Sequence, residues 1–156
     1  MGRIDQRLKE LGLVLPPPWT ARGAFLPFRR EGLVVYLSGQ ICEWDGRVTC
    51  VGPVGPGGVD IATAQAAAKI CALNLLYTIR LACDGDLDRV SAVLRLGGFV
   101  NCQSGFGDSP AVINAATQVF IDVFGDAGRH ARTAVGVAGL PGNASVEVDA
   151  VVALAA

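Results

Sequence analysis

The chain has 156 residues, of which 51% are hydrophobic and 17% are charged, and its formal net charge is -1 at neutral pH. This length is typical of one domain, and the near-neutral charge without a Lys/Arg run offers no footprint for a polyanion, so nucleic acid is disfavoured as a partner. The low charge density predicts that part of the surface is covered, most simply by copies of the same chain.

The five cysteines are an odd number without a C-x-x-C pair, so neither a disulfide framework nor a metal site is expected. We expect reduced, mostly buried thiols. The N-terminal region lacks a long apolar segment with a cleavage site, and no apolar stretch approaches the roughly 18 residues of a membrane span. These features predict a cytoplasmic protein that is neither exported nor held in a membrane.

The first element in chain order is a short amphipathic helix, because charges and leucines alternate at helical spacing in the sequence IDQRLKELGL. Three prolines then fix an extended segment that ends at Pro18. We divide the chain into this N-terminal helix with its proline-rich lead-in, residues 1–18, and a single domain, residues 19–156. The helix is expected to be an appendage of that domain.

Two strands are expected next. The sequence GLVVYLSGQI is β-branched and apolar, and Asp45-Gly46 is a strong hairpin signal before the sequence VTC. This pattern predicts two adjacent strands joined by a tight turn. The sequence VGPVGPGG is read as a loop that leads to the first main helix.

The first main helix is expected to begin after Asp60, whose carboxylate can cap its first turn. Gln65, Lys69 and Asn74 lie off the apolar stripe of this helix, which is expected to face the core. The stripe consists of Ala64, Ala68, Cys71, Leu75, Ile79 and Ala82.

A long strand is predicted over residues 89–102, where Gly97-Gly98 is expected to form a bulge or a bend. The second main helix has Ser109 as its N-cap and Pro110 at its first position, and it stops at Gly125. Two more strands, ARTAVGVAGL and SVEVDAVVAL, flank the turn PGNA. The order predicts an α+β fold with one sheet, both main helices on one face, and the other face left for partners.

The motifs in this order resemble the Rid family of reactive-intermediate deaminases, also called YjgF-like or endoribonuclease L-PSP-like. The resemblance covers roughly residues 23–154 and rests on LSGQI, AQAAAKICALNLLYTI, INAATQVF, ARTAVGVAGLP and VEVDAVVAL. It implies a chorismate-mutase-like fold with a single mixed sheet, assembled as a homotrimer whose sheets face inward and whose ligand clefts lie between subunits. It also implies hydrolysis of 2-imino acids or enamines to 2-keto acids and ammonia without a metal or an organic cofactor.

Arg132 stands at the start of an apolar strand, so its guanidinium needs either water or an anionic partner. Strand alternation puts Arg132, Ala134 and Gly136 on one face, with room above the guanidinium for a small ligand. The resemblance implies that Arg132 holds the substrate carboxylate and that Glu147 holds the attacking water or passes its proton. From the residues alone, Arg132 can also be a surface arginine at a strand end and Glu147 an outward-facing charge on an alternating strand. A backbone carbonyl could also activate the water.

The resemblance implies further substrate-binding positions. Ser38 and Gly39 match a turn whose backbone lines the cleft, and Asn114 matches a helix asparagine near the subunit contact. Gly39 can equally serve only a bend, and Asn114 can equally be a packing or helix-surface residue. Phe25 stands where many members have a tyrosine, and Ala134 stands where a cysteine is common, so this chain lacks that hydroxyl and that thiol. The expected ligand is a small carboxylate-bearing metabolite.

Two alternatives remain open at this point. A trimer that binds small carboxylates without turnover, or acts like a chaperone, is favoured by the missing hydroxyl at Phe25. An RNA-cleaving enzyme is disfavoured by the acidic isoelectric point and by the single histidine, His130. No nucleophile motif accompanies that histidine, so a catalytic triad is not expected.

Overall fold

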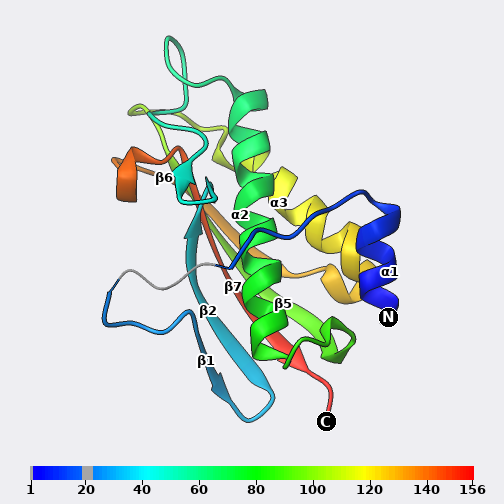
Figure 1. The fold of residues 1–156 in the computed structure, drawn as a ribbon. Helices are drawn as coiled ribbons and strands as arrows, with labels where there is room; N and C mark the ends of the chain where they lie inside the picture. Colours follow the sequence, from blue (N-terminus) through cyan, green and yellow to red (C-terminus); the bar gives the residue numbers. More distant parts are fainter. Residues whose placement is uncertain (1, 19–22) are drawn as a thin grey trace.

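The computed structural model describes residues 2–18 and 23–156, and Figure 1 shows two long helices, α2 and α3, against one face of a sheet. Helix α2 spans Ile61–Ala82 and α3 spans Ser109–Phe124. The sheet has five strands in the order β1-β2-β7-β5-β6, and every neighbouring pair is antiparallel except β5 and β6, which are parallel. The strands are β1 Phe28–Glu31, β2 Val34–Ile41, β5 Val90–Asn101, β6 Ala131–Val137 and β7 Val146–Leu154. The predicted α+β fold with one mixed sheet is confirmed.

The predicted hairpin at Asp45-Gly46 forms, but its strands do not join the main sheet. Both turn residues have positive φ, as a tight two-residue hairpin turn requires. Strands β3, Glu43–Trp44, and β4, Arg47–Val48, make a separate two-stranded sheet. The prediction that the hairpin partner lies beside β2 in the main sheet is therefore wrong: β2 pairs with β1 and β7. Strand β1 is mostly charged and exposed, as an edge strand can be, which explains why no apolar pattern predicts it.

The glycine pair in β5 was expected to interrupt the strand, and this prediction is wrong. Gly97 and Gly98 pair in register with Asp149 and Val148, while the irregularities of β5 lie before them, between Val90 and Arg95. The glycines instead allow α3 to pack closely on the sheet. A Cβ on Gly98 would lie 2.5 Å from Cγ1 of Ile113, so the missing side chain lets α3 rest directly on the sheet.

Helix α2 begins where predicted, because the Asp60 carboxylate accepts a hydrogen bond from the backbone N–H of Thr63 at 2.8 Å. Asn74 was placed off the apolar stripe, yet it is buried. Its Nδ2 donates to the carbonyls of Ile41 (3.1 Å) and Glu43 (2.8 Å). Asn74 thus ties the helix to the end of β2 and to the start of β3.

Helix α3 starts one residue earlier than predicted. Ser109 is its first residue and is buried, and Asp108 takes the N-cap position that we assigned to Ser109. The Asp108 carbonyl accepts from the N–H groups of Ala111 and Val112, which sets this start. Short 3-10 segments at Leu87–Arg89, Gly125–Gly128 and Pro141–Asn143 connect the longer elements.

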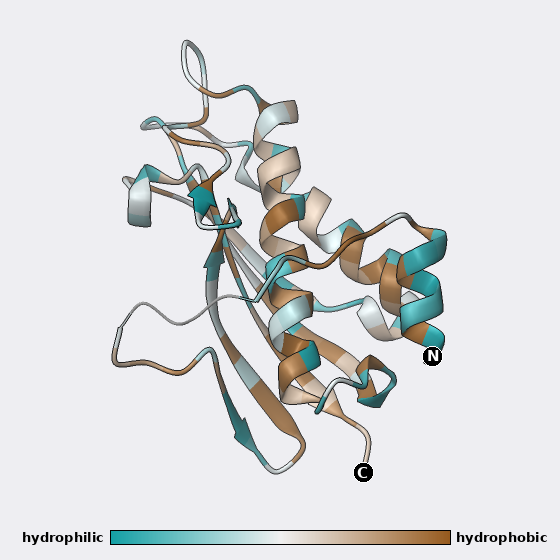
Figure 2. Ribbon diagram, in the orientation of Figure 1, coloured by the Kyte–Doolittle hydropathy of each residue, from teal (hydrophilic) through white to brown (hydrophobic). Residues whose placement is uncertain are grey.

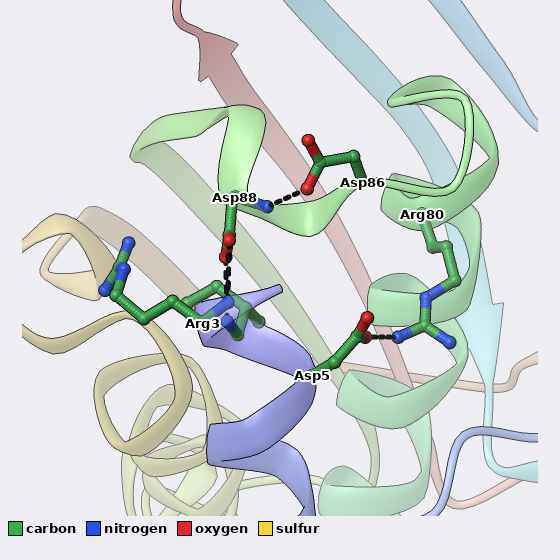
Figure 3. A network of polar contacts seen from close by, with 6 residues as sticks. Arg3, Asp5, Arg80, Asp86 and Asp88 are labelled. Atoms are coloured by element: carbon green, nitrogen blue, oxygen red, sulfur yellow. Dashed lines mark hydrogen bonds and ion pairs between the residues drawn. The ribbon is translucent and has the colours of Figure 1, made fainter. Parts of the chain in front are cut away.

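The N-terminal helix α1, Arg3–Glu10, forms as predicted but is part of the core rather than an appendage. Ile4 and Leu8 are 1% and 5% exposed, and full burial of one such side chain contributes about 1.5–3 kcal/mol. Polar contacts fix its orientation (Figure 3): Asp88 accepts from the N–H groups of Arg3 and Ile4, at 2.7 Å each, and Arg80 pairs with Asp5. Figure 2 shows that the other residues of α1 are mostly hydrophilic.

All five cysteines are free, and four are buried, as predicted. In residues 2–18 and 23–156, none of the helices combines the length and apolar character needed to cross a membrane.

Removing the carboxylate that caps α1 tests how the helix is held. Asp88→Ala removes two charge-assisted hydrogen bonds, so we expect a loss of about 1 kcal/mol, the usual value of a side-chain cap, and a Tm lower by roughly 2–4 °C. Amide exchange should accelerate in the first turn of α1 and stay unchanged in β7. Asp84→Ala, which removes an exposed ion pair with Arg89 and does not touch α1, is the control. Equal exchange in α1 for both variants would contradict this account.

Candidate functional site

Strand β7 sets the direction of the candidate acid, Glu147. Its burial alternates strictly, and Val146 and Val148 are fully buried on the side of the helices. Because successive side chains of a strand point to opposite faces, Glu147 and Asp149 project from the face that the helices leave open. The sequence alternation V-E-V-D-A encodes this division directly.

The Glu147 carboxyl lies beside a β-bulge in β2. The pairing of β2 with β7 shifts between Leu37 and Gln40, so Ser38 and Gly39 together stand opposite Asp149. A Cβ on Gly39 would lie 2.3 Å from Oε1 of Glu147. A side chain at this position would displace the Glu147 carboxyl, so glycine lets the carboxyl lie against β2.

A cavity of about 330 Å³ opens at this edge, and Glu147, Gly39 and Phe25 all line it. Its volume falls at the lower end of the range of about 300–1,000 Å³ typical of small-molecule sites. Partial burial raises the pKa of Glu147 above its ordinary value of 4.5, and the negative charge of Asp149 raises it further. A carboxylate with a raised pKa beside a cavity is suited to accept a proton from bound water.

The segment before β1 brings Phe25 to this cavity. Ser38 holds the segment, because its Oγ donates to the Leu26 carbonyl at 2.6 Å and its N–H donates to the Pro27 carbonyl at 3.0 Å. Ser38 is not among the cavity-lining residues, so its placement differs from that of Gly39. Phe25 is 51% exposed, which leaves its ring free to contact a ligand or a second chain.

Arg132 lies on the other side of the sheet. It pairs in parallel register with the buried Leu96 of β5, and its side chain contacts α3. Nη1 donates to Oδ1 of Asn114 at 2.8 Å and to Oγ1 of Thr117 at 3.1 Å, and Nη2 approaches the Pro110 carbonyl at 3.5 Å. Among residues 2–18 and 23–156, none accepts from Nε–H, and Nη2 keeps one N–H beyond its contact with Pro110, so the Nε/Nη2 edge of the guanidinium can still hold an anion. Ala134 is the next residue on this face of β6.

Arg132 is supported by His130 and Thr117, which the sequence did not assign to the site. Nδ1 of His130 lies 2.6 Å from the Gly128 carbonyl, which only accepts, so this nitrogen carries the proton. In the neutral ring, Nε2 then accepts from the Thr117 hydroxyl at 3.1 Å, and that hydroxyl accepts from Arg132. Burial lowers the pKa of His130, and the charge of Arg132 lowers it further, so the neutral form is favoured. The available signal was the spacing of two residues between His130, just before β6, and Arg132, together with the spacing of three residues between Asn114 and Thr117 on one helix face.

The structure thus sorts the candidate residues into two groups. Phe25, Gly39 and Glu147 line the cavity at β2, whereas Arg132 and Asn114 meet between β6 and α3. The groups lie on opposite faces of the sheet, and β5 separates β7 from β6. One copy of the chain cannot bring Arg132 and Glu147 against the same small ligand.

A larger cavity of about 660 Å³ lies between the glycine-rich loops that precede α2 and α3. None of the candidate residues lines it, and its charged residues are Asp60, which caps α2, and Asp108. Volume alone is therefore a poor guide here, and we assign the site by the chemistry of its lining. Across the described part of the chain, three or more His, Cys, Asp or Glu side chains nowhere gather as a metal ion would require.

Comparison with known proteins gives consistent matches over nearly the whole chain. The sequence profile of a family described as "YjgF/chorismate_mutase-like, putative endoribonuclease" matches residues 5–154. The crystal structure of Atu1372 from Agrobacterium tumefaciens, a protein of unknown function, has 44% identity and a TM-score of 0.88 over 97% of this chain and 91% of that one. The crystal structure of a protein from Shewanella oneidensis described as a "putative endoribonuclease" has 28% identity and a TM-score of 0.91 over 97% of this chain and 99% of that one. Protein TCP17 of Trypanosoma cruzi is 39% identical over 98% of this chain and 95% of its own.

The single histidine makes the support of Arg132 directly measurable, because one imidazole gives one set of NMR titration signals. We expect His130 to titrate below 6.5, and Arg132→Gln to raise its pKa by removing a positive charge. Since the folded pKa is the lower one, the unfolded chain takes up this proton first, so this contribution to stability is lost as pH falls below 6.5. A titration at or above 6.5 in the unaltered protein would contradict the burial and the hydrogen-bond direction given above.

Proposed function

Because the chain belongs to the YjgF/chorismate-mutase-like family, we propose that it is a Rid-type hydrolase that converts 2-imino acids or their enamines to 2-keto acids and ammonia. The observation that carries the proposal is the separation of two complementary half-sites. Arg132 offers an open guanidinium edge on one face, and Glu147 offers a carboxyl with a raised pKa on the other. Each half-site needs what the other supplies, so the complete site forms between two copies.

A homotrimer satisfies this requirement, since a closed ring of head-to-tail contacts joins the Arg132 side of each copy to the Glu147 side of the next. The open face of the sheet supports such an assembly. Tyr36 and Val135, which share that face with Glu147, are 54% and 41% exposed in the single chain. Burial of such side chains between subunits is favourable.

The proposed role of Arg132 is to hold the substrate carboxylate. Asn114 and Thr117 occupy Nη1 and fix the plane of the guanidinium, while Nε–H and an Nη2–H present the parallel pair of donors that a carboxylate accepts. The neutral His130 behind Thr117 adds no positive charge. Arg132 is therefore oriented before substrate binds, which reduces the entropy lost on binding.

The proposed role of Glu147 is to accept a proton from water as the water oxygen bonds to the imine carbon. The product of this addition is a carbinolamine. With the imine protonated at the start, the proton on Glu147 then passes to the carbinolamine nitrogen. Glu147 accepts the hydroxyl proton as the C=O bond forms and the C–N bond breaks, ammonia leaves, and Glu147 releases the proton to solvent. The step conserves atoms and needs no oxidant, because the imine carbon has the same oxidation level as the ketone.

A trimer that binds carboxylates without turnover is the second candidate, and the observation in its favour is Phe25. The ring lines the cavity beside Glu147 but has no hydroxyl to donate to a substrate or a leaving group. Both candidates bind 2-keto acids, and only the hydrolase releases a keto acid from a freshly generated imine. RNA cleavage is less consistent with the cavity, because the carboxylates of Asp45 and Glu147 would repel a phosphodiester.

A mixing experiment tests the shared site. Arg132→Ala and Glu147→Gln should each form trimers by light scattering and should each lose at least about a hundredfold in activity, as expected when a binding or base group is removed. Each mixed trimer of the two variants contains one interface with both groups intact. Refolding them together in equal amounts should therefore restore about a quarter of the wild-type rate.

The control is each variant refolded alone, which should stay inactive. Failure of the mixture to gain activity while mixed trimers form would overturn the shared site. Monomers in solution would do the same, because neither half-site would have its partner.

The pH dependence of turnover should report Glu147. The base must be deprotonated, so a raised pKa places the acidic limb of the kcat/KM profile above pH 4.5. Burial remains in Asp149→Asn, but one negative neighbour is removed, so the limb should move toward lower pH in this variant. Asp126→Asn, on the exposed segment after α3, is the control and should leave the limb in place. A limb that does not respond to Asp149 would argue against Glu147 as the base.

A further inference from the structure

The N-terminal segment does more than cover the core, because its three prolines reach the cavity that holds Glu147. Pro16, Pro17 and Pro18 line this cavity together with Phe25. We propose that the N-terminal segment, residues 3–18, is the specificity element of the site and that it selects 2-imino acids with branched aliphatic or aromatic side chains. This inference rests on the proposed function, and it names the substrate class of the same site.

The segment is fastened along its length, so the prolines are held in place. Helix α1 is docked by Ile4 and Leu8 at its start, and Asp88 fixes its first turn (Figure 3). Leu13 and Leu15 then pack against the core. The segment runs past α2, where residues 12–14 and Ile70 line one shallow depression, before it reaches the sheet edge (Figure 1). Pro16 itself is buried, while Pro17 and Pro18 are exposed.

The chemistry of this wall is apolar and rigid. Proline has no backbone N–H and its φ is fixed, so three in succession offer ring surfaces and no donors. Pro141 and Ile41 continue the apolar lining around Phe25. Asn74 contributes little free polarity, because its Nδ2 is already bound to two backbone carbonyls. Gln40, Glu43 and Asp45 also line the cavity, so its apolar surface comes from the prolines, Phe25 and Ile41, and this part of the lining is complementary to a hydrocarbon or aromatic group.

The position of the wall relative to Glu147 assigns it to the side chain of the substrate. The reacting carbon must lie at Glu147, and the carboxylate must point out of the cavity toward Arg132 of the next subunit. The substituent that remains on the reacting carbon is the side chain, and it enters the cavity. Asp45 at the exposed turn of the hairpin disfavours an acidic side chain there. The expected order of kcat/KM is leucine- and phenylalanine-derived imines first, then alanine-derived, then glutamate-derived.

Two variants change the wall in opposite directions. The triple variant Pro16→Ala, Pro17→Ala, Pro18→Ala removes ring surface, so the preference for leucine-derived over alanine-derived imine should fall about tenfold, with the loss in KM. Pro17→Trp adds bulk at an exposed position that should not disturb folding. It should reject the phenylalanine-derived imine while still accepting the alanine-derived one. Pro56→Ala and Pro56→Trp, in a loop that lines a different cavity, are matched controls that should keep the wild-type order.

Calorimetric titration of the products 4-methyl-2-oxopentanoate, phenylpyruvate and pyruvate gives a readout that does not depend on turnover. If no imine is hydrolysed but the Kd order of these acids shifts in the wall variants, the hydrolase proposal fails and the specificity element stands. If imines are hydrolysed but the wall variants keep the wild-type KM ratios and Kd order, the specificity element is overturned and the hydrolase stands.

Discussion

The alternation of side chains along β7 is the constraint on which the rest of the molecule depends. Val146, Val148, Ala150 and Val152 supply the centre of the core beneath α2. The same alternation forces Glu147 and Asp149 onto the face that lacks helices, where partial burial raises the pKa of Glu147. Packing and chemistry thus come from one period-two pattern, and a register slip of one residue would destroy both.

The proposed assembly follows from the sheet face that this alternation leaves without helices. A sheet with helices on one face has a second face to cover, and an edge strand such as β6 carries a cation with an open donor edge. An uncovered sheet face and an unpaired guanidinium edge are both unfavourable in an isolated chain. Contact between copies can cover the face and give the guanidinium a partner. In the proposed trimer, the contact that buries the open face also completes the site, so association and activity share one interface.

Much of the fold could be predicted because the relevant signals are local. Asp60 before an apolar helical stripe, Asp45-Gly46 between short β-branched runs, and the alternation V-E-V-D-A each have a direct physical reading, and each feature appears in the structure. The wrong predictions concern features whose conformation depends on a tertiary contact. The glycine pair of β5 looked like a break, because nothing in the sequence reveals that Ile113 of α3 rests on Gly98.

The sequence supplies candidate site residues one by one but not their arrangement. Arg132, Asn114, Glu147, Gly39 and Phe25 could be named from motifs, yet their division between two faces depends on strand order. Thr117 and His130 act behind Arg132 through a directed set of hydrogen bonds, which only the packing of α3 against β6 creates. The wall formed by Pro16, Pro17 and Pro18 was missed because residues 1–18 were treated as separate from the domain, although α1 shares its core.

The contact between Gly98 and Ile113 also affects how Asn114 meets Arg132. Asn114 follows Ile113 directly, so the spacing of α3 from the sheet at this point also sets how closely the Asn114 amide meets the Arg132 guanidinium. Replacing Gly98 with alanine would lift the helix and misalign that pair, although Gly98 touches no ligand. Such a mutation would therefore act on the hydrogen bond between Asn114 and Arg132 through the position of α3.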